Sequence, residues 1–426
     1  MTFGAIFLAF FMIQVDRNLS PEAIRNLGFG YYNQPDGARS LISTVASSMI
    51  TVAGTTFSIT LAVLSLTSGQ FGPRLLSNFM RDLGNQVVLG TFVSTYVYCL
   101  LVLRTIHTDS DAFAAFVPHL SIIVAILLAL LNVGVFIYFI HHTAESIQAS
   151  TITARISGDL MGMIKRLYPE ATPDDVPAPP PVIPRELDPH KAQAVALIQH
   201  RSGYLQNLDE DGLLNFATEH NVTVQCLQLP GTFVLENQPV ALVWPKDVLE
   251  DDACEGLSNY FTLGPRRTPA HDLDFLFDQL SEMALRALSP GVNDAVTAMR
   301  CADRVAQGLH LMVSRRPPAS HRFDEEGGLR VVLPQIDLGN LVADTLGEFR
   351  RFSADNMLVS MHLLDIIGTL LVSTDNADLR RALLSEAGLI REGGEKVLLE
   401  DDFARLDRRY EEVANATGPV FLRPAR

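Results

Sequence analysis

Hydroxyl side chains recur at helical spacing between residues 44 and 69. Their oxygens can replace part of the hydration shell of an ion, which predicts a pore-lining face. Small hydroxyl residues also allow tight packing between membrane helices, with hydrogen bonds worth about 0.6 kcal/mol on average, so both interpretations stay open. The residues that share this face, at steps of three or four, are Thr44, Ser48, Thr51, Thr55, Ser58, Ala62, Ser65 and Gly69. Further hydroxyls at Thr56, Thr60, Thr67 and Ser68 add weight to the pore.

Two polar residues, Gln70 and Arg74, follow this segment around the helix-ending pair Gly72-Pro73. As a functional pair they would form a ring at the mouth of a pore and attract anions. The simpler interpretation is an interfacial anchor, in which the arginine extends its charged group to the lipid headgroups.

Histidines lie near the ends of the last apolar segment. His141 and Glu145 are stacked four residues apart beside His142, and His119 lies at the other end. Zinc requires three or four ligands, and no third ligand accompanies His141 and Glu145. We therefore predict no metal and no cofactor, and interpret these four residues as interfacial and pH-sensitive.

Signals of catalysis are missing from the chain. The segment Ser289-Pro290-Gly291-Val292-Asn293-Asp294 lacks a base and a strand-to-helix elbow for a serine nucleophile. Asp294 or Asn293 is better placed to cap the following helix. Phosphate-binding, dinucleotide-binding and zinc-protease motifs are also absent. We predict that the protein is not an enzyme.

Long uncharged segments must position these residues. Residues 40–73 form a run of 34 positions without a charged side chain. A bilayer-spanning helix needs about 20 apolar residues. Four spans are expected, at about 1–15, 41–67, 85–104 and 118–140, the first being short. A charge within a span usually marks a proton or metal path, and none is present, which argues against a pump.

Charge separates the two halves of the chain. Residues 1–168 carry 9 Lys and Arg against 8 Asp and Glu, whereas residues 169–426 carry 24 against 40. Such an acidic C-terminal half does not suit nucleic acid. With both termini on one side, the positive-inside rule favours that side by one cation. The unpaired spacing of Cys99, Cys226, Cys254 and Cys301 suits a reducing compartment. We predict a bacterial inner (plasma) membrane protein with a cytoplasmic C-terminal domain.

Composition divides the chain into four parts: a transmembrane domain with a helical extension (1–168), a proline-rich linker (169–190), a small β-rich module (191–250) and a helical cytoplasmic domain (251–426). Strands are expected within 202–209, 222–229 and 232–244, around a short helix. Helices are expected from residue 272 and at 294–313, 338–352, 355–373, 376–387 and 400–415, with a loop at 315–328.

Four sequence blocks resemble a known family: SMITVAGTTFSITLAVLSLTSGQFGPRLL, FVPHLS, YFIHHTAESIQ and ALSPGVNDAVTA. They are similar to the predicted integral membrane proteins grouped as domain of unknown function 2254, over about residues 40–310. The family tends to have proline after Asn-Asp, where this chain has Ala295. The resemblance implies a membrane topology with a soluble domain, and no activity.

Residues 202–244 are also similar to the barrel-sandwich fold of biotinyl and lipoyl carriers. Those carriers need a lysine at a hairpin tip, and this segment contains none, since Lys246 follows it. The resemblance therefore implies a small β-barrel or sandwich that is structural or binds protein.

The fold class expected is an α-helical membrane protein of about four spans, with a cytoplasmic α+β domain built from this β module and a helical bundle. The leading hypothesis is a homo-oligomeric channel or pore for small ions, lined by the second span and assembled or gated by the soluble domain. The alternative is a membrane-anchored scaffold or sensor whose soluble domain binds a ligand or a protein. The expected partners are the lipid bilayer, further copies of the chain and small ions.

Overall fold

The computed structural model describes residues 1–18, 34–71, 83–108, 116–170, 193–196, 202–245, 253 and 256–415. Within these residues the chain forms two compact units, Met1–Thr151 and Ile152–Arg426, each described by itself. The sequence-based division kept the helical extension with the membrane region, whereas the structure divides the chain at the start of this helix.

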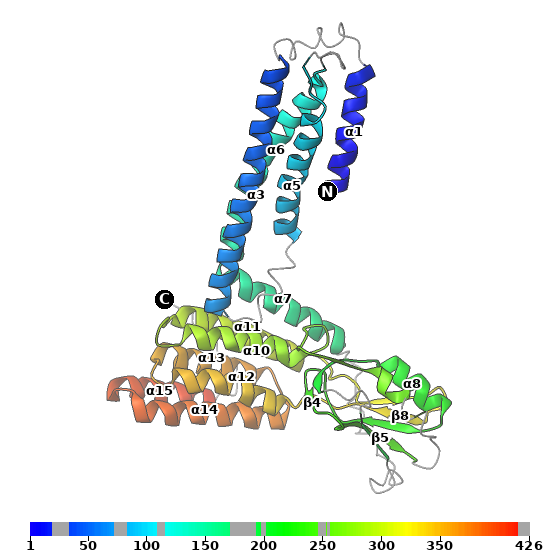
Figure 1. Cartoon of the computed structure of the whole chain (residues 1–426). Helices are drawn as coiled ribbons and strands as arrows, with labels where there is room; N and C mark the ends of the chain where they lie inside the picture. The colour runs from blue at the N-terminus through cyan, green and yellow to red at the C-terminus, as the bar shows by residue number, and fades with distance from the viewer. Residues whose placement is uncertain are drawn as a thin grey trace. The chain divides into compact units, whose positions relative to one another are not determined.

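The described residues of the first unit form four long helices: α1 (Thr2–Asn18), α3 (Pro35–Phe71), α5 (Leu83–Leu103) and α6 (His119–Ser146). α5 packs against each of the other three (Figure 1). Two apolar clusters hold the helices together; one includes Ile42, Tyr98 and Ile122, and the other Met49, Phe92 and Phe139. Because α5 lies between its neighbours, its residues carry much of this core.

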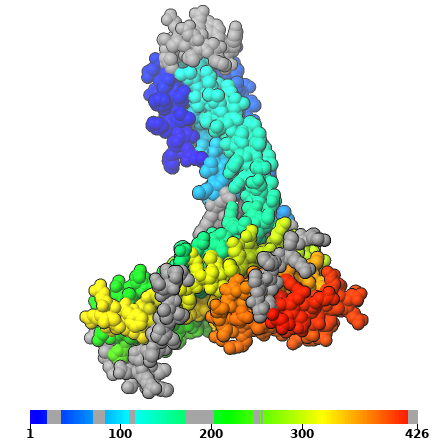
Figure 2. All heavy atoms as spheres, turned by 180° about the vertical axis from the view of Figure 1, so that it is seen from behind, coloured from blue at the N-terminus to red at the C-terminus, as the bar shows by residue number. Residues whose placement is uncertain are grey.

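Three of these helices are long and apolar enough to cross a membrane: Pro35–Thr67 of α3, α5 and α6. The expected fourth span is not confirmed. α1 coincides with it but has only 17 residues, which is the lower limit of a spanning helix. The exposed side chains of α6 include Leu127, Leu130, Leu131 and Ile137. α6 forms the cyan column of Figure 2, and these exposed apolar side chains suit contact with lipid.

The second unit begins with α7 (Ala149–Leu167), which packs on helices of the same unit. Ser157 Oγ donates to Gln307 Oε1 at 3.2 Å, and Arg315 donates to the Tyr168 carbonyl at 2.7 Å. Gly308 permits this close approach, because a Cβ there would lie 2.8 Å from a Leu160 methyl. These contacts explain why α7 belongs to the second unit.

Two small sheets follow. The five-stranded sheet has the order β1-β5-β3-β8-β7, and the three-stranded sheet has the order β4-β2-β6. All neighbouring strands are antiparallel except β3 and β8, which pair in parallel with Val224 opposite Val331. The strands are β1 (Gln193–Ala196), β2 (Gly203–Leu208), β3 (Thr223–Cys226), β4 (Phe233–Val234), β5 (Pro239–Trp244), β6 (Phe261–Gly264), β7 (His321–Phe323) and β8 (Leu329–Val332).

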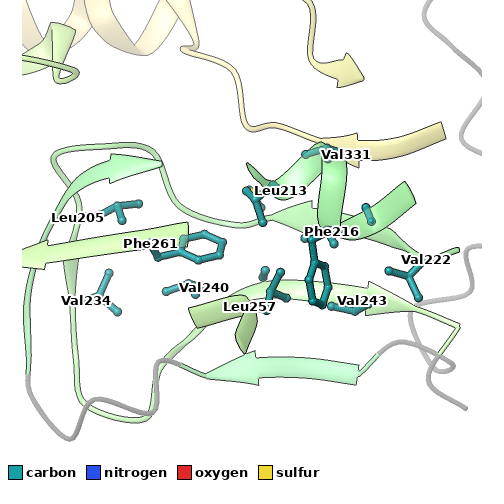
Figure 3. Packing of buried hydrophobic residues seen from close by; sticks show 14 of the residues in the cluster. Leu205, Leu213, Phe216, Val222, Val234, Val240, Val243, Leu257, Phe261 and Val331 are labelled. Carbon is teal, nitrogen blue, oxygen red and sulfur yellow. The ribbon is translucent and has the colours of Figure 1, made fainter. Parts of the chain in front are cut away.

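A shared core joins the two sheets. Leu205 and Phe261 from the smaller sheet and Val240 from the larger one are buried together with Phe216 of α8 (Glu210–Glu219) (Figure 3). Burial of each such side chain contributes about 1.5–3 kcal/mol. The expected barrel-like module is not confirmed, because β6, β7 and β8 come from beyond residue 250 and complete two separate sheets.

The remaining elements are helical, and Asp or Asn caps many of them. Asp294 accepts from the Thr297 amide at 3.0 Å at the start of α11, which confirms the capping prediction. The helices are α10 (Leu273–Ala287), α11 (Ala295–Val313), α12 (Leu338–Ser353), α13 (Met357–Val372), α14 (Ala377–Val397) and α15 (Glu400–Ala414), with the 3₁₀ turn η4 (Ser258–Tyr260) before β6. The segment 315–328, expected as a loop, contains β7.

Candidate functional site

α3 turns its small polar side chains away from the helices on which it packs. Its bundle-facing residues are buried: Ala38, Ile42, Ala46, Met49 and Ala53. The predicted pore-lining residues are exposed on the surface of the chain: Thr44, Ser48, Thr51, Thr55, Ser58 and Ser65. A helix turns about 100° per residue, so Ser48 lies about 200° around the axis from Ala46. No helix of the first unit that the structure describes buries this hydroxyl face.

Each hydroxyl along the middle of this face donates to the carbonyl one turn earlier. The donor–acceptor distances are 2.8 Å for Thr44, Ser48 and Thr51, 3.0 Å for Thr55 and 2.9 Å for Ser58. A hydroxyl has one donor hydrogen and two acceptor lone pairs. Because the hydrogen is used within the helix, the oxygen lone pairs remain available outside it. The face therefore presents acceptors, which suit cations and water.

A shallow groove runs along this face, because the side chains are small. It is lined by Ser43, Thr44, Ser47, Ser48, Thr51 and Val52. Two of the further hydroxyls do not belong to it. Thr56 and Thr67 are buried, at 2% and 6% exposure. Their positions on the helix turn them towards the bundle, so they add nothing to the exposed face.

The predicted pore-mouth residues cannot be placed. The backbone of Gln70 belongs to α3, but its side chain lies outside the described residues, as does the whole of Arg74.

The four interfacial residues do not form one cluster. His119 is the first residue of α6, whereas His141, His142 and Glu145 lie in its last turns. His141 Nε2 lies 3.2 Å from Glu145 Oε1 in an exposed pair, and the His142 ring stacks on Tyr138 at 5.3 Å between centroids. Within the described ranges, no group of three or more His, Cys, Asp or Glu side chains is arranged to hold a metal ion.

One buried carboxylate, that of Asp16, was not predicted from the sequence. Asp16 is 6% exposed near the end of α1, and it accepts from the amides of Leu120 and Ser121 at 2.8 and 2.9 Å. Its Oδ2 also accepts from the Ser121 hydroxyl at 2.6 Å. Asp16 thus satisfies free amides at the start of α6 and complements its helix dipole. The sequence signal that could have indicated this role is an acidic residue directly after an apolar run.

A polar contact also crosses the core between two spans. Asn132 of α6 donates through Nδ2 to Thr95 Oγ1 of α5 at 2.7 Å, and both residues are buried. The Asn132 Oδ1 atom is buried without a partner. Neither residue belongs to the α3 stripe. The pair fixes the register of the two helices and holds a spare acceptor inside the bundle.

In the second unit, carboxylates gather around Arg267. Its guanidinium binds Asp272 at 2.6 and 2.8 Å and Asp278 at 2.5 Å. Asp272 also caps α10 through the Phe275 amide at 2.9 Å. A Cβ on Gly231, which has φ +98°, would collide with the Asp272 carboxylate, so only glycine fits this turn. The cluster fastens the turn at residues 230–231 to α10.

Apolar helices near the N-terminus and an α+β C-terminal unit define the class, which is a membrane protein with a large second unit. The chain belongs to the family described as predicted membrane protein (DUF2254), whose model matches residues 1–369. This match confirms the family resemblance.

Curated relatives include uncharacterized proteins of Mycobacterium tuberculosis and Mycobacterium bovis. The proteins from both species are 30% identical over 365 residues, which cover 84% of this chain and 68% of each relative. No solved structure matches the chain.

Proposed function

We propose that the protein is a homo-oligomeric membrane channel for small ions, in which α3 of several copies lines a common axis. The observation that carries this proposal is the exposed hydroxyl face of α3, opposite the side that packs on its own bundle. At a rise of 1.5 Å per residue, Thr44 to Ser65 covers about 32 Å, the thickness of the hydrocarbon core.

The chemistry of the face favours cations. Every hydroxyl from Thr44 to Ser58 whose hydrogen is directed at its own helix presents lone pairs outward. Such oxygens coordinate a partly dehydrated cation as filter oxygens do in other channels. The same internal hydrogen bonds also satisfy the hydroxyls against lipid, so the lining role requires a direct electrical test.

Currents in planar bilayers provide this test. With the purified wild-type chain, we expect cation-selective currents, measured by the reversal potential in a salt gradient. The double substitution Thr51→Leu and Thr55→Leu places two apolar side chains on the axis and should lower unitary conductance at least tenfold. Unchanged currents in this variant would show that α3 does not line the pathway.

A matched control comes from α5. Thr91 is half-buried and donates to the Val87 carbonyl at 2.7 Å, the same internal bond that Thr51 and Thr55 make. Thr91→Leu therefore makes an equivalent chemical change away from the proposed axis and should leave the currents unchanged.

The second candidate function is a membrane-anchored scaffold or sensor whose soluble unit binds a ligand or a protein. The observation in its favour is a partly enclosed pocket within the second unit, where a buried carboxylate oxygen has no partner. Wild-type protein that carries no current but binds a small molecule would favour this candidate.

We place the chain in a bacterial inner membrane, with the second unit in the cytoplasm. The side that carries the second unit has one more Lys or Arg near the spans than the opposite side, which supports this orientation. Reporter fusions at the C-terminus that are active only in the cytoplasm should be active, and activity of a periplasm-dependent reporter would reverse the orientation.

A further inference from the structure

A small pocket lies among the elements of the second unit. It has a volume of about 120 Å³ and is lined by α7, β2, the turn at residues 229–230, the start of α10 and the segments 318–322 and 333–336. Its apolar wall includes Leu208, Leu229, Leu273, Leu333 and Ile336. The volume equals that of about four water molecules, which suits a ligand with a handful of heavy atoms.

The polar groups of the pocket differ in how well they are paired. Arg322 lies 2.7 Å from Glu210 and also donates to the Ala319 carbonyl at 2.5 Å, so this ion pair is already complete. Asp274 belongs to the same lining, and its Oδ1 atom is buried without a hydrogen-bond partner. A buried acceptor without a partner costs about 1–3 kcal/mol. A ligand that donates a hydrogen bond to this oxygen would remove that cost and gain binding free energy.

The surroundings of Asp274 carry excess negative charge. The pKa of Asp274 is raised to about 6, first by burial and then by the charges of Asp272, Asp278 and Asp344, against the opposing effect of Arg267. Arg267 is already shared between Asp272 and Asp278. One guanidinium therefore faces four carboxylates, and a positive ligand would restore the balance.

An aromatic side chain completes the lining. Tyr168 is 3% exposed and lies at the end of α7, where it lines the pocket together with Asp274. The pKa of Tyr168 is raised to about 12, first by burial and then by the charge of Asp274. A neutral phenol beside a carboxylate suits an ammonium group, because its ring face attracts cations and its oxygen can accept a hydrogen bond.

We propose that this pocket binds a small organic cation with a primary ammonium group on a short aliphatic chain. The ammonium donates to Asp274 Oδ1 beside Tyr168, and the methylene groups contact the leucine and isoleucine wall. The ligand touches both the helices and the sheet segments of the unit. This proposal does not rest on conduction by α3. The bound cation would act as a regulatory ligand of the channel or as the ligand of the sensor.

The test measures binding to the full chain in lipid nanodiscs. The probes are ethylammonium chloride, ethanolammonium chloride and putrescine dihydrochloride, with sodium chloride, ethanol and sodium acetate as references. At least one amine should bind saturably by calorimetry and raise the unfolding temperature. Asp274→Asn should weaken this binding at least tenfold. Glu282→Gln is the matched control on the same helix, because Glu282 pairs with Arg286 outside the pocket, and it should bind as the wild type does.

A second variant keeps the proposal testable if Asp274→Asn does not fold. Ala319 is exposed at the pocket lining, and Ala319→Phe fills the cavity without a change in charge, so it should also abolish amine binding. Amine binding that survives both substitutions, acetate binding in place of amines, or no saturable binding to the wild type would each overturn the proposal. Binding by the Thr51→Leu and Thr55→Leu variant should be normal, which separates this result from any failure of the channel.

Discussion

At the scale of single residues, two carboxylates have surroundings that their neighbours in sequence do not predict. Asp16 ends an apolar helix and accepts three hydrogen bonds from the start of α6. Asp274 lies in the first turn of α10 with a buried oxygen that accepts none. The first satisfies its surroundings and stabilises the fold, whereas the second leaves a charge unmatched, as binding sites commonly do.

Replacement of Asp16 by alanine should loosen the docking of α1 on α6. The substitution leaves the buried amide and hydroxyl of Ser121 without their acceptor, at a cost of about 1–3 kcal/mol. Denaturant titration of the full chain in detergent measures this loss as a decrease in the free energy of unfolding. Asp36→Ala, at an exposed acid in the first turn of α3, should change stability by less than about 0.5 kcal/mol. An equal effect of both substitutions would contradict the capping role.

Asp274→Asn should make the chain more stable at neutral pH. The pKa of Asp274 is raised from 3.8 to about 6, so between these values the folded chain binds more protons than the unfolded chain. Stability from this group therefore falls as pH rises from about 4 to about 6 and stays lower above it, by up to about 3 kcal/mol. Asparagine removes the charge and hence this loss.

Thermal unfolding of both proteins at pH 4.5 and pH 7.5 tests the prediction. At pH 7.5 the variant should unfold at a higher temperature, with a free energy of unfolding larger by ~1–3 kcal/mol, and this difference should narrow at pH 4.5. Glu282→Gln controls for the loss of one charge from α10. A variant less stable than the wild type at pH 7.5 would mean that ionised Asp274 makes a stabilising contact.

At the scale of elements, local periodicity predicted the helices well and the sheets only in part. The stripe Leu273, Leu276, Leu280 and Met283 gave α10, and Asp294 marked the start of α11. The parallel pairing of Val224 with Val331 could not be predicted, because the two strands lie about 100 residues apart and each has four residues. Short strands carry little local signal, and their partners are chosen by tertiary packing.

The candidate site was predictable to a similar degree. Helical spacing placed Thr51 and Thr55 on one face, and the structure has both exposed. Spacing alone did not say that Thr56 faces the bundle, because that depends on where α5 packs. Asp274 was not predicted as a site residue, since its unpartnered oxygen is a consequence of segments far away in sequence.

The contact between α5 and α6 gives a prediction for the membrane helices. Thr95→Val, Asn132→Leu and the double variant form a thermodynamic cycle for the hydrogen bond at 2.7 Å. We expect a coupling energy of about 0.5–1.5 kcal/mol, since hydrogen bonds between membrane helices average ~0.6 kcal/mol. Unfolding of the three variants and the wild type in mixed micelles supplies the four free energies. Additive effects would show that the pair does not join the helices.

At the scale of the whole molecule, the chain combines a bundle of apolar helices with an acidic α+β unit. α5 is enclosed by its neighbours, while α3 stays at the periphery of the bundle with its hydroxyl face uncovered within the described unit. A single copy therefore cannot enclose a water-filled path along that face. If α3 lines a pore, the surfaces that close it must come from other copies.

The number of copies follows from the width of a helix. Neighbouring helix axes lie about 8–10 Å apart, and a helix with its side chains is about 10–12 Å wide. Two or three α3 helices in a ring leave no lumen, whereas about five leave one of ~3 Å radius. We therefore expect about four to six copies, measured by native mass spectrometry from nanodiscs. The Thr51→Leu and Thr55→Leu variant should have the same number of copies as the wild type. A lower conductance would then come from the missing hydroxyls and not from a change in assembly. A monomer or a dimer under every lipid condition would leave the hydroxyl face against lipid or one partner helix, and a pore lined by α3 would be geometrically impossible.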